Sequence, residues 1–73
     1  MNNKDVRISI ARKIKDARKE ANLNQSQLGS RVFMDKTTIC CIETGKSGVS
    51  SDRLFDFAKA LNKPIIYFLS DIS

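Results

Sequence analysis

Residues that break helices are scarce in this chain. It has a single proline, Pro64, and three glycines, at positions 29, 45 and 48, among 73 residues. The segments between them consist largely of good helix formers, which favours an all-α fold. A chain of this length forms one small domain, and such a domain buries only about 60% of the surface that its unfolded chain exposes. We therefore expect residues 1–73 to form a single all-α domain.

The spacing of apolar residues predicts a first helix over residues 5–21. Spacings of three and four place its apolar side chains on one face. Asn22 can end this helix in a left-handed conformation. The residues of the apolar stripe are Val6, Ile10, Ile14, Ala17 and Ala21.

Helix caps mark the three helices that follow. Asn24 and Gln27 have the spacing of a capping box, so a second short helix begins after Asn24. Asp35 is placed to cap a third helix over residues 36–44, and Ser50 to cap a fourth.

The second and third helices are joined by only three residues, which is the arrangement of a helix-turn-helix at about residues 24–44. In this motif the outer face of the second helix lies in the major groove of DNA, which admits one α-helix. Lysine can donate there to guanine or phosphate, and threonine can present its methyl group to thymine. With Ile39 and Ile42 turned inward, the outward residues of the third helix are Lys36, Thr37, Cys40, Cys41 and Thr44.

Two stretches carry a family resemblance, LNQSQLG from Leu23 to Gly29 and ICCIETGK from Ile39 to Lys46. They resemble the lambdoid repressor and Cro-like helix-turn-helix family, also called the xenobiotic-response-element family. The resemblance covers about residues 10–69. It implies a compact all-α bundle of five short helices, and a bacterial or phage transcriptional regulator that binds double-stranded operator DNA, usually as a dimer.

The resemblance also implies roles for individual residues. The family's base-contacting positions align with Lys36, Thr37, Cys40 and Cys41. Its phosphate-contacting positions align with Asn24, Gln25, Thr44 and Lys46, partly through the N-terminus of the second helix. For Asp35 we expect capping alone.

One position departs from the family pattern, because the turn normally carries glycine and here carries Phe33. A bulky side chain on a residue with positive φ costs on the order of 1 kcal/mol or more. We therefore expect either a rebuilt turn or a packing role for Phe33 that offsets the strain.

Arg18 and Glu43 each extend an apolar helix stripe by four residues, beyond Ile14 and Ile39. Each charge therefore points toward packed surface, where an unpaired ion is costly. We predict a bidentate ion pair between them that fixes the third helix against the first, and the resemblance implies the same bond.

The absence of histidine removes the commonest general base and metal ligand, and with it every nucleophile–histidine pair. Cys40 and Cys41 are the only cysteines, and two such ligands do not complete an ordinary structural zinc site. We expect no enzymatic activity, no metal and no cofactor. A redox switch at these cysteines is a less favoured alternative, because Glu43 nearby works against thiolate formation.

Basic side chains outnumber acidic ones by 13 to 8, a net charge of +5. Seven of the basic and three of the acidic residues lie in residues 4–20, so 7 − 3 = +4 of this excess is there. This basic excess is consistent with a stripe that faces DNA and with a solvated helix face. In both cases the charge promotes nonspecific affinity for DNA. No apolar run is long enough for a signal peptide or a membrane span, so we expect a cytoplasmic protein without a membrane partner.

The segment 65–69 is apolar throughout, and periodicity does not distinguish a helix from a strand over five residues. One element of a small domain has only one buried side, so some of these residues are left exposed. We predict a homodimer whose interface contains Ile65, Ile66 and Tyr67.

A protein-interaction module, such as an antitoxin or an antirepressor partner, is the alternative function for the same fold. An apolar outer face on the third helix would favour that alternative. The polar residues Lys36 and Thr37 favour nucleic acid instead.

Overall fold

The computed structural model describes residues 3–70, with side chains from residue 5 onward. This part of the chain contains five helices and no strand, so the predicted all-α class is confirmed. Residues 65–69, for which the sequence allowed either a helix or a strand, form a helix. The helices are α1 (Asn3–Glu20), α2 (Gln25–Val32), α3 (Lys36–Glu43), α4 (Ser51–Ala60) and α5 (Ile65–Leu69).

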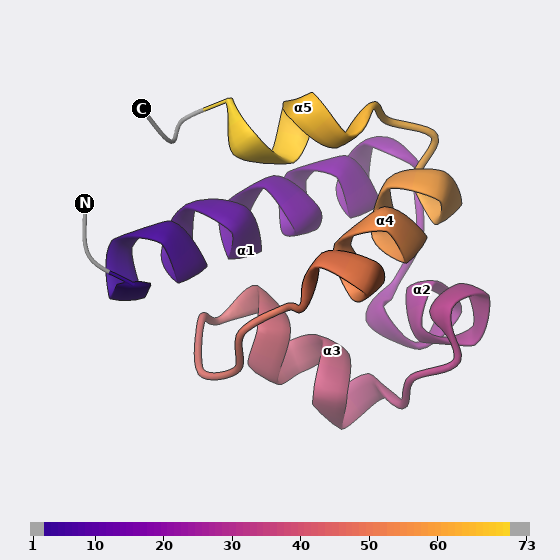
Figure 1. Ribbon diagram of the computed structural model, residues 1–73. Helices are drawn as coiled ribbons and strands as arrows, with labels where there is room; N and C mark the ends of the chain where they lie inside the picture. The colour runs from indigo at the N-terminus through magenta and orange to yellow at the C-terminus, as the bar shows by residue number, and fades with distance from the viewer. Residues whose placement is uncertain (1–2, 71–73) are drawn as a thin grey trace.

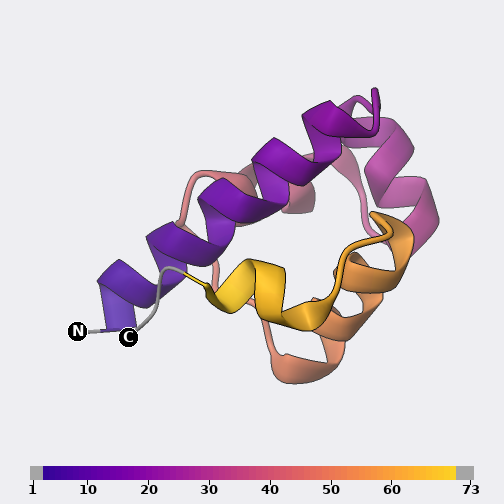
Figure 2. The ribbon, with the colours of Figure 1, turned by 90° about the horizontal axis from the view of Figure 1, so that it is seen from above.

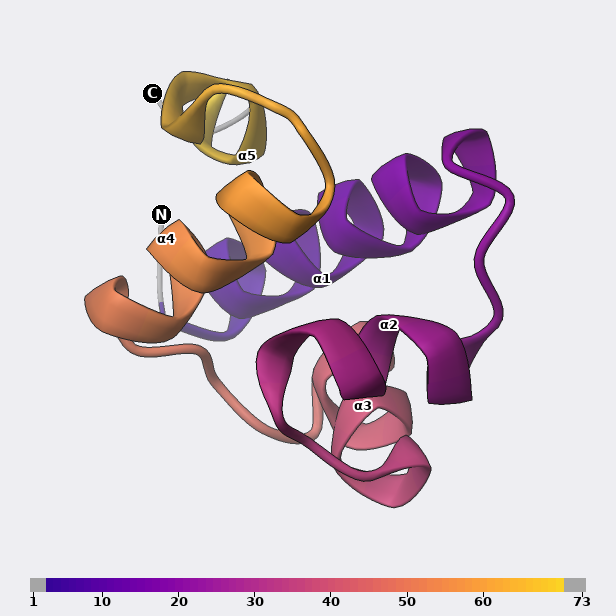
Figure 3. The same cartoon turned by 90° about the vertical axis from the view of Figure 1, so that its right-hand side faces the viewer.

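The long helix α1 forms the spine of the bundle. The short helix α5 lies alongside it, whereas α3 lies at the opposite edge of the molecule (Figure 1, Figure 3). Figure 2 shows α5 and α4 together on one side of α1. Helix α3 is thus left with one face directed away from the rest of the protein.

The core draws on every helix of the bundle. Helix α1 buries Ile14 and Ala17 as predicted, whereas Ala21 follows the end of the helix and is exposed. Burial of each large apolar side chain contributes about 1.5–3 kcal/mol, which makes this cluster the main source of stability. The largest fully buried side chains are Ile14, Leu28, Val32, Ile39, Phe57 and Phe68.

The predicted caps are present. The Asn24 side chain accepts a hydrogen bond from the Gln27 backbone N–H at 2.7 Å, and the Gln27 side chain accepts one from the Asn24 N–H at 2.8 Å, which completes the capping box. Ser50 caps α4 by accepting from the Arg53 N–H. Asn22 adopts the expected left-handed conformation after α1, with φ of 60°.

Both expectations for Phe33 are wrong. The turn is not rebuilt, because Phe33 ends α2 in the left-handed conformation, with φ of 60° and ψ of 43°. The side chain does not pack either, because it is 91% exposed. The strain of a non-glycine residue in this region therefore has no compensating contact of its own.

Gly29 allows the turn to fold back onto α2. A Cβ atom at this position would collide with the backbone carbonyl oxygen of Met34, on the other side of the turn. The Met34 N–H also donates to the Gly29 carbonyl at 2.9 Å. The small residue is thus required by the backbone of the turn itself.

No helix within residues 3–70 is both long and apolar enough to cross a membrane.

Candidate nucleic-acid interface

The helix α3 has two chemically different sides. Ile39 and Ile42 are buried in the core, as the sequence predicts. The opposite side is polar and open to solvent, with Cys41 half-buried at its margin. Its exposed residues include Lys36, Thr37, Cys40 and Thr44. The structure therefore gathers the predicted base-contacting residues on one convex, accessible surface.

A buried ion pair holds the C-terminal end of α3 against α1. Arg18 donates through Nε to Glu43 Oε2 at 2.6 Å and through Nη2 to Oε1 at 3.0 Å, the bidentate geometry that the sequence predicts. Arg18 is 9% exposed and Glu43 8%. A third guanidinium nitrogen, Nη1, donates to the Leu23 carbonyl at 2.8 Å. Every charged group of the pair is therefore satisfied, which is the condition under which a buried ion pair is tolerated.

Gln25 is also part of this network. Its Nε2 donates to Glu43 Oε1 at 3.2 Å, so the first residue of α2 is tied to the last residue of α3. Sequence reasoning placed Gln25 at a phosphate but missed this contact, because no local pattern relates residues 18 positions apart. The bond uses one amide hydrogen and leaves the other available as a donor.

The N-terminal end of α3 is capped by a single exposed carboxylate. Asp35 accepts from the Thr38 backbone N–H at 2.7 Å. Hydrogen bonds from the Thr38 side chain and backbone hold the pKa of Asp35 below its ordinary value of 3.8. Asp35 thus has the capping role that the sequence predicts, and its negative charge lies at the positive end of the helix dipole.

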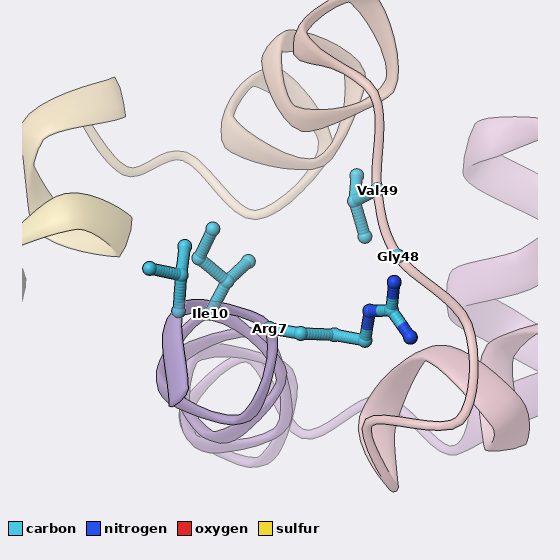
Figure 4. Close-up of a pocket in the computed structure, with 5 residues that line it drawn as sticks. Arg7, Ile10, Gly48 and Val49 are labelled. Atoms are coloured by element: carbon cyan, nitrogen blue, oxygen red, sulfur yellow. The ribbon is translucent and has the colours of Figure 1, made fainter. Parts of the chain in front are cut away.

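The loop that follows α3 is folded tightly onto the end of the helix. Gly45 takes a φ of 80°, and the Lys46 N–H donates to the Cys41 carbonyl at 3.0 Å. Arg7 reaches from α1 to this loop, with its guanidinium beside Gly48 (Figure 4). The two predicted phosphate-contacting residues of this region, Thr44 and Lys46, are both exposed.

Helix α5 leaves one large side chain open. Ile66 is 65% exposed, whereas Ile65 and Tyr67 are half-buried. The Tyr67 ring is already flanked within the chain, with Lys13 Nζ 5.0 Å and Lys63 Nζ 4.8 Å from its centroid. The three residues of the predicted dimer interface are therefore not equally available.

An apolar groove lies beside α5. Phe55, 59% exposed, contributes to it from α4. Its apolar lining residues are Ile10, Val49, Leu54, Phe55, Ile65 and Leu69. The accessible apolar surface near α5 thus extends toward α4, which the sequence did not indicate.

No group of three or more histidine, cysteine, aspartate or glutamate side chains that could hold a metal ion occurs among the residues that the structure describes. Cys40 and Cys41 are free thiols.

Comparison with known proteins identifies the family. The helix-turn-helix family model matches residues 14–68. A curated relative from Rhodospirillum rubrum, an uncharacterized transcriptional regulator in the ATPase CF(0) region, is 35% identical over 63 residues. The match covers 86% of this chain but only 58% of that relative, so the chain spans less than two thirds of the relative's length.

Two solved structures share the fold. The restriction–modification controller protein C.AhdI from Aeromonas hydrophila superposes with a TM-score of 0.85 at 18% identity, over 93% of this chain and 99% of that one. The clp gene regulator ClgR from C. glutamicum gives a TM-score of 0.82 at 17% identity, over 93% and 94% of the two chains. With its capped helix pair, its exposed polar α3 and this family match, the chain belongs to the helix-turn-helix family of the repressor and Cro type.

Proposed function

We propose that this protein is a sequence-specific regulator of transcription, of the repressor or controller type, that binds double-stranded DNA through the major groove. The observation that carries the proposal is the exposed polar face of α3, anchored from behind by the buried Arg18–Glu43 pair. A rigid helix with donors on its outer face matches the width of the groove and the hydrogen-bonding pattern of its base edges. No catalytic activity is part of this proposal.

The proposal assigns base contacts and phosphate contacts to two different sets of residues. Lys36, Thr37, Cys40 and Cys41 contact bases, whereas Asn24, Gln25, Thr44 and Lys46 contact phosphates. The second set lies around the ends of α2 and α3, where backbone N–H groups and side-chain donors can fix the register of the helix on the duplex.

A homodimer would place two α3 helices in successive major grooves of a near-palindromic operator. Exposed Ile66, with Ile65 and the groove beside Phe55, supports α5 as the contact surface. Tyr67 contributes less than its neighbours, because two lysines of the same chain already flank its ring. Sedimentation as a monomer at high micromolar concentration, with and without DNA, would refute the dimer.

Selection of bound duplexes from a random pool, followed by footprinting, tests the function directly. The expected result is an enriched near-palindromic sequence that the protein protects. Lys36→Ala and Thr37→Ala should then lose sequence preference more than nonspecific affinity, whereas Lys46→Ala should weaken binding to all sequences alike. An unenriched pool, or affinity that does not fall as salt rises, would favour a protein-interaction module instead.

A further inference from the structure

The basic residues of α1 do not share one environment. Lys13 lies over the Tyr67 ring, and the Arg18 guanidinium is buried in its ion pair. Three others, Arg12, Lys15 and Lys19, are exposed and line one groove with Thr44 at the end of α3. Their spacings of three and four residues place them on a single face of α1, directed to the same side as this groove.

This set, which we name the α1 stripe (Arg12, Lys15 and Lys19), continues the exposed surface of α3. Glu43 and Thr44 line the same groove from the C-terminal end of α3, and α1 lies above α3 in the view of Figure 1. Gln25 contacts the same Glu43 carboxylate from the start of α2. The α1 stripe and the N-terminus of α2 therefore both flank α3 on the side of Glu43.

We propose that the α1 stripe is a second phosphate-binding site, which contacts the DNA backbone next to the strand segment held by the N-terminus of α2. The inference rests on the proposed function, since it requires α3 to lie in the major groove. A helix with its side chains is about as wide as that groove, so the phosphates of its rim lie directly beside α3. The next protein surface on that side is the α1 stripe.

The dimensions and the charge of the site fit this ligand. Seven residues of helix separate Arg12 from Lys19, about 10 Å, which matches two or three successive phosphates of one strand. Asp16 is the one exposed acidic side chain that lines the groove, because Glu43 is buried and paired with Arg18. Three cations against one anion leave the groove positive, and neutralising phosphates there would release counterions.

The test is the salt dependence of affinity for random-sequence duplex oligonucleotides. The triple variant Arg12→Gln, Lys15→Gln, Lys19→Gln should bind more weakly and should reduce the slope of log affinity against log salt by about 2 to 3 units. All three side chains are exposed, so circular dichroism should show an unchanged fold. Lys59→Gln is the matched control, because this exposed lysine lies on α4 away from the groove and should leave the slope unchanged.

A variant that adds affinity complements the loss. Asp16→Asn removes the opposing charge from the groove and should tighten binding to every duplex to a similar degree. A parental protein that binds duplex DNA, together with a triple variant whose slope matches that of the parent, would overturn the second phosphate site alone. A parental protein that does not bind DNA would overturn the proposed function and the site together, so the two failures are distinguishable.

Discussion

The two ends of α3 are held in place by different forces. The C-terminal end is tied to α1 and α2 by a buried network in which Glu43 accepts hydrogen bonds from Arg18 and Gln25. The N-terminal end depends on local backbone features, the exposed cap at Asp35 and the left-handed residue Phe33. The first end is fixed by contacts distant in sequence, and the second by a few neighbouring residues.

This difference between the two ends indicates that the position of α3 is determined mainly at its C-terminal end. Loss of one partner from the buried network leaves an uncompensated charge in the core, so that end tolerates little change. The exposed turn has no comparable penalty, because water can satisfy whatever a substitution frees. Substitutions at the two ends should therefore differ in size and even in sign.

The largest effect is expected from Glu43→Ala. This change strands the buried Arg18 guanidinium and should lower the free energy of unfolding by about 3–5 kcal/mol. Denaturant unfolding measures it. The matched control is Glu20→Ala, which breaks the surface pair with half-buried Lys63 and should cost less than about 1 kcal/mol.

A double variant separates the cost of stranding a buried charge from the loss of the ion pair itself. Arg18→Met with Glu43→Leu removes both charges together and should recover most of the stability that Glu43→Ala loses. Equal losses for Glu43→Ala and Glu20→Ala would show that the buried end is no more firmly held than the surface.

A smaller effect of opposite sign is expected from Phe33→Gly. Glycine adopts a φ of 60° without steric strain, and the exposed phenyl ring gives up almost no packing. Glycine also gives the unfolded chain more conformational freedom, which offsets part of this gain. The free energy of unfolding should therefore rise by about 0.5–1 kcal/mol. Thermal unfolding at equal concentration checks this, and a destabilised variant would reveal a packing role for the ring.

The smallest effect concerns the pH dependence of the cap. The pKa of Asp35 is lower in the folded protein than its ordinary value of 3.8, so the folded state binds fewer protons than the unfolded state in this range. The contribution of the cap is therefore complete above pH 3.8 and is lost as the pH falls through the folded pKa. NMR titration of the carboxyl carbon measures the pKa directly.

Two variants sharpen this measurement. Thr38→Val removes the hydroxyl that donates to Asp35 and should raise the pKa toward 3.8. Asp35→Asn keeps a capping oxygen but does not titrate, so the stability difference between it and the parent should shrink below pH 3.8. A stability difference between the two proteins that stays constant with pH would show that the Asp35 carboxylate does not contribute to the pH dependence of stability.

The same division explains how much of the molecule could be predicted from its sequence. Caps at Asn24, Asp35 and Ser50 are local signals and are confirmed by the structure. The burial of Ile39 and Ile42 follows from helical spacing in the same way. The Arg18–Glu43 ion pair could also be predicted, because two charged residues on apolar helix stripes have few alternatives to pairing with each other.

The features that escaped prediction depend on tertiary contacts. The hydrogen bond from Gln25 to Glu43 and the contact of Lys13 with the Tyr67 ring join segments that no local pattern relates. The helical state of residues 65–69 is of this kind, since five apolar residues fit either structure until Phe68 packs into the core. The α1 stripe could not be separated from the other basic residues of α1 until the structure showed which of them line the groove beside Thr44.

The fit at Gly29 bears on how such a protein can diversify. The Met34 oxygen stands where a methyl group at position 29 would have to go, and a main-chain atom cannot swing aside as a flexible side chain can. A change at this position would open the angle between the paired helices before it loosened the core. Residues on the outer face of α3 have no such constraint. Under the proposed function, new sequence preferences can therefore arise by substitutions on that face while the arrangement of the helices stays the same.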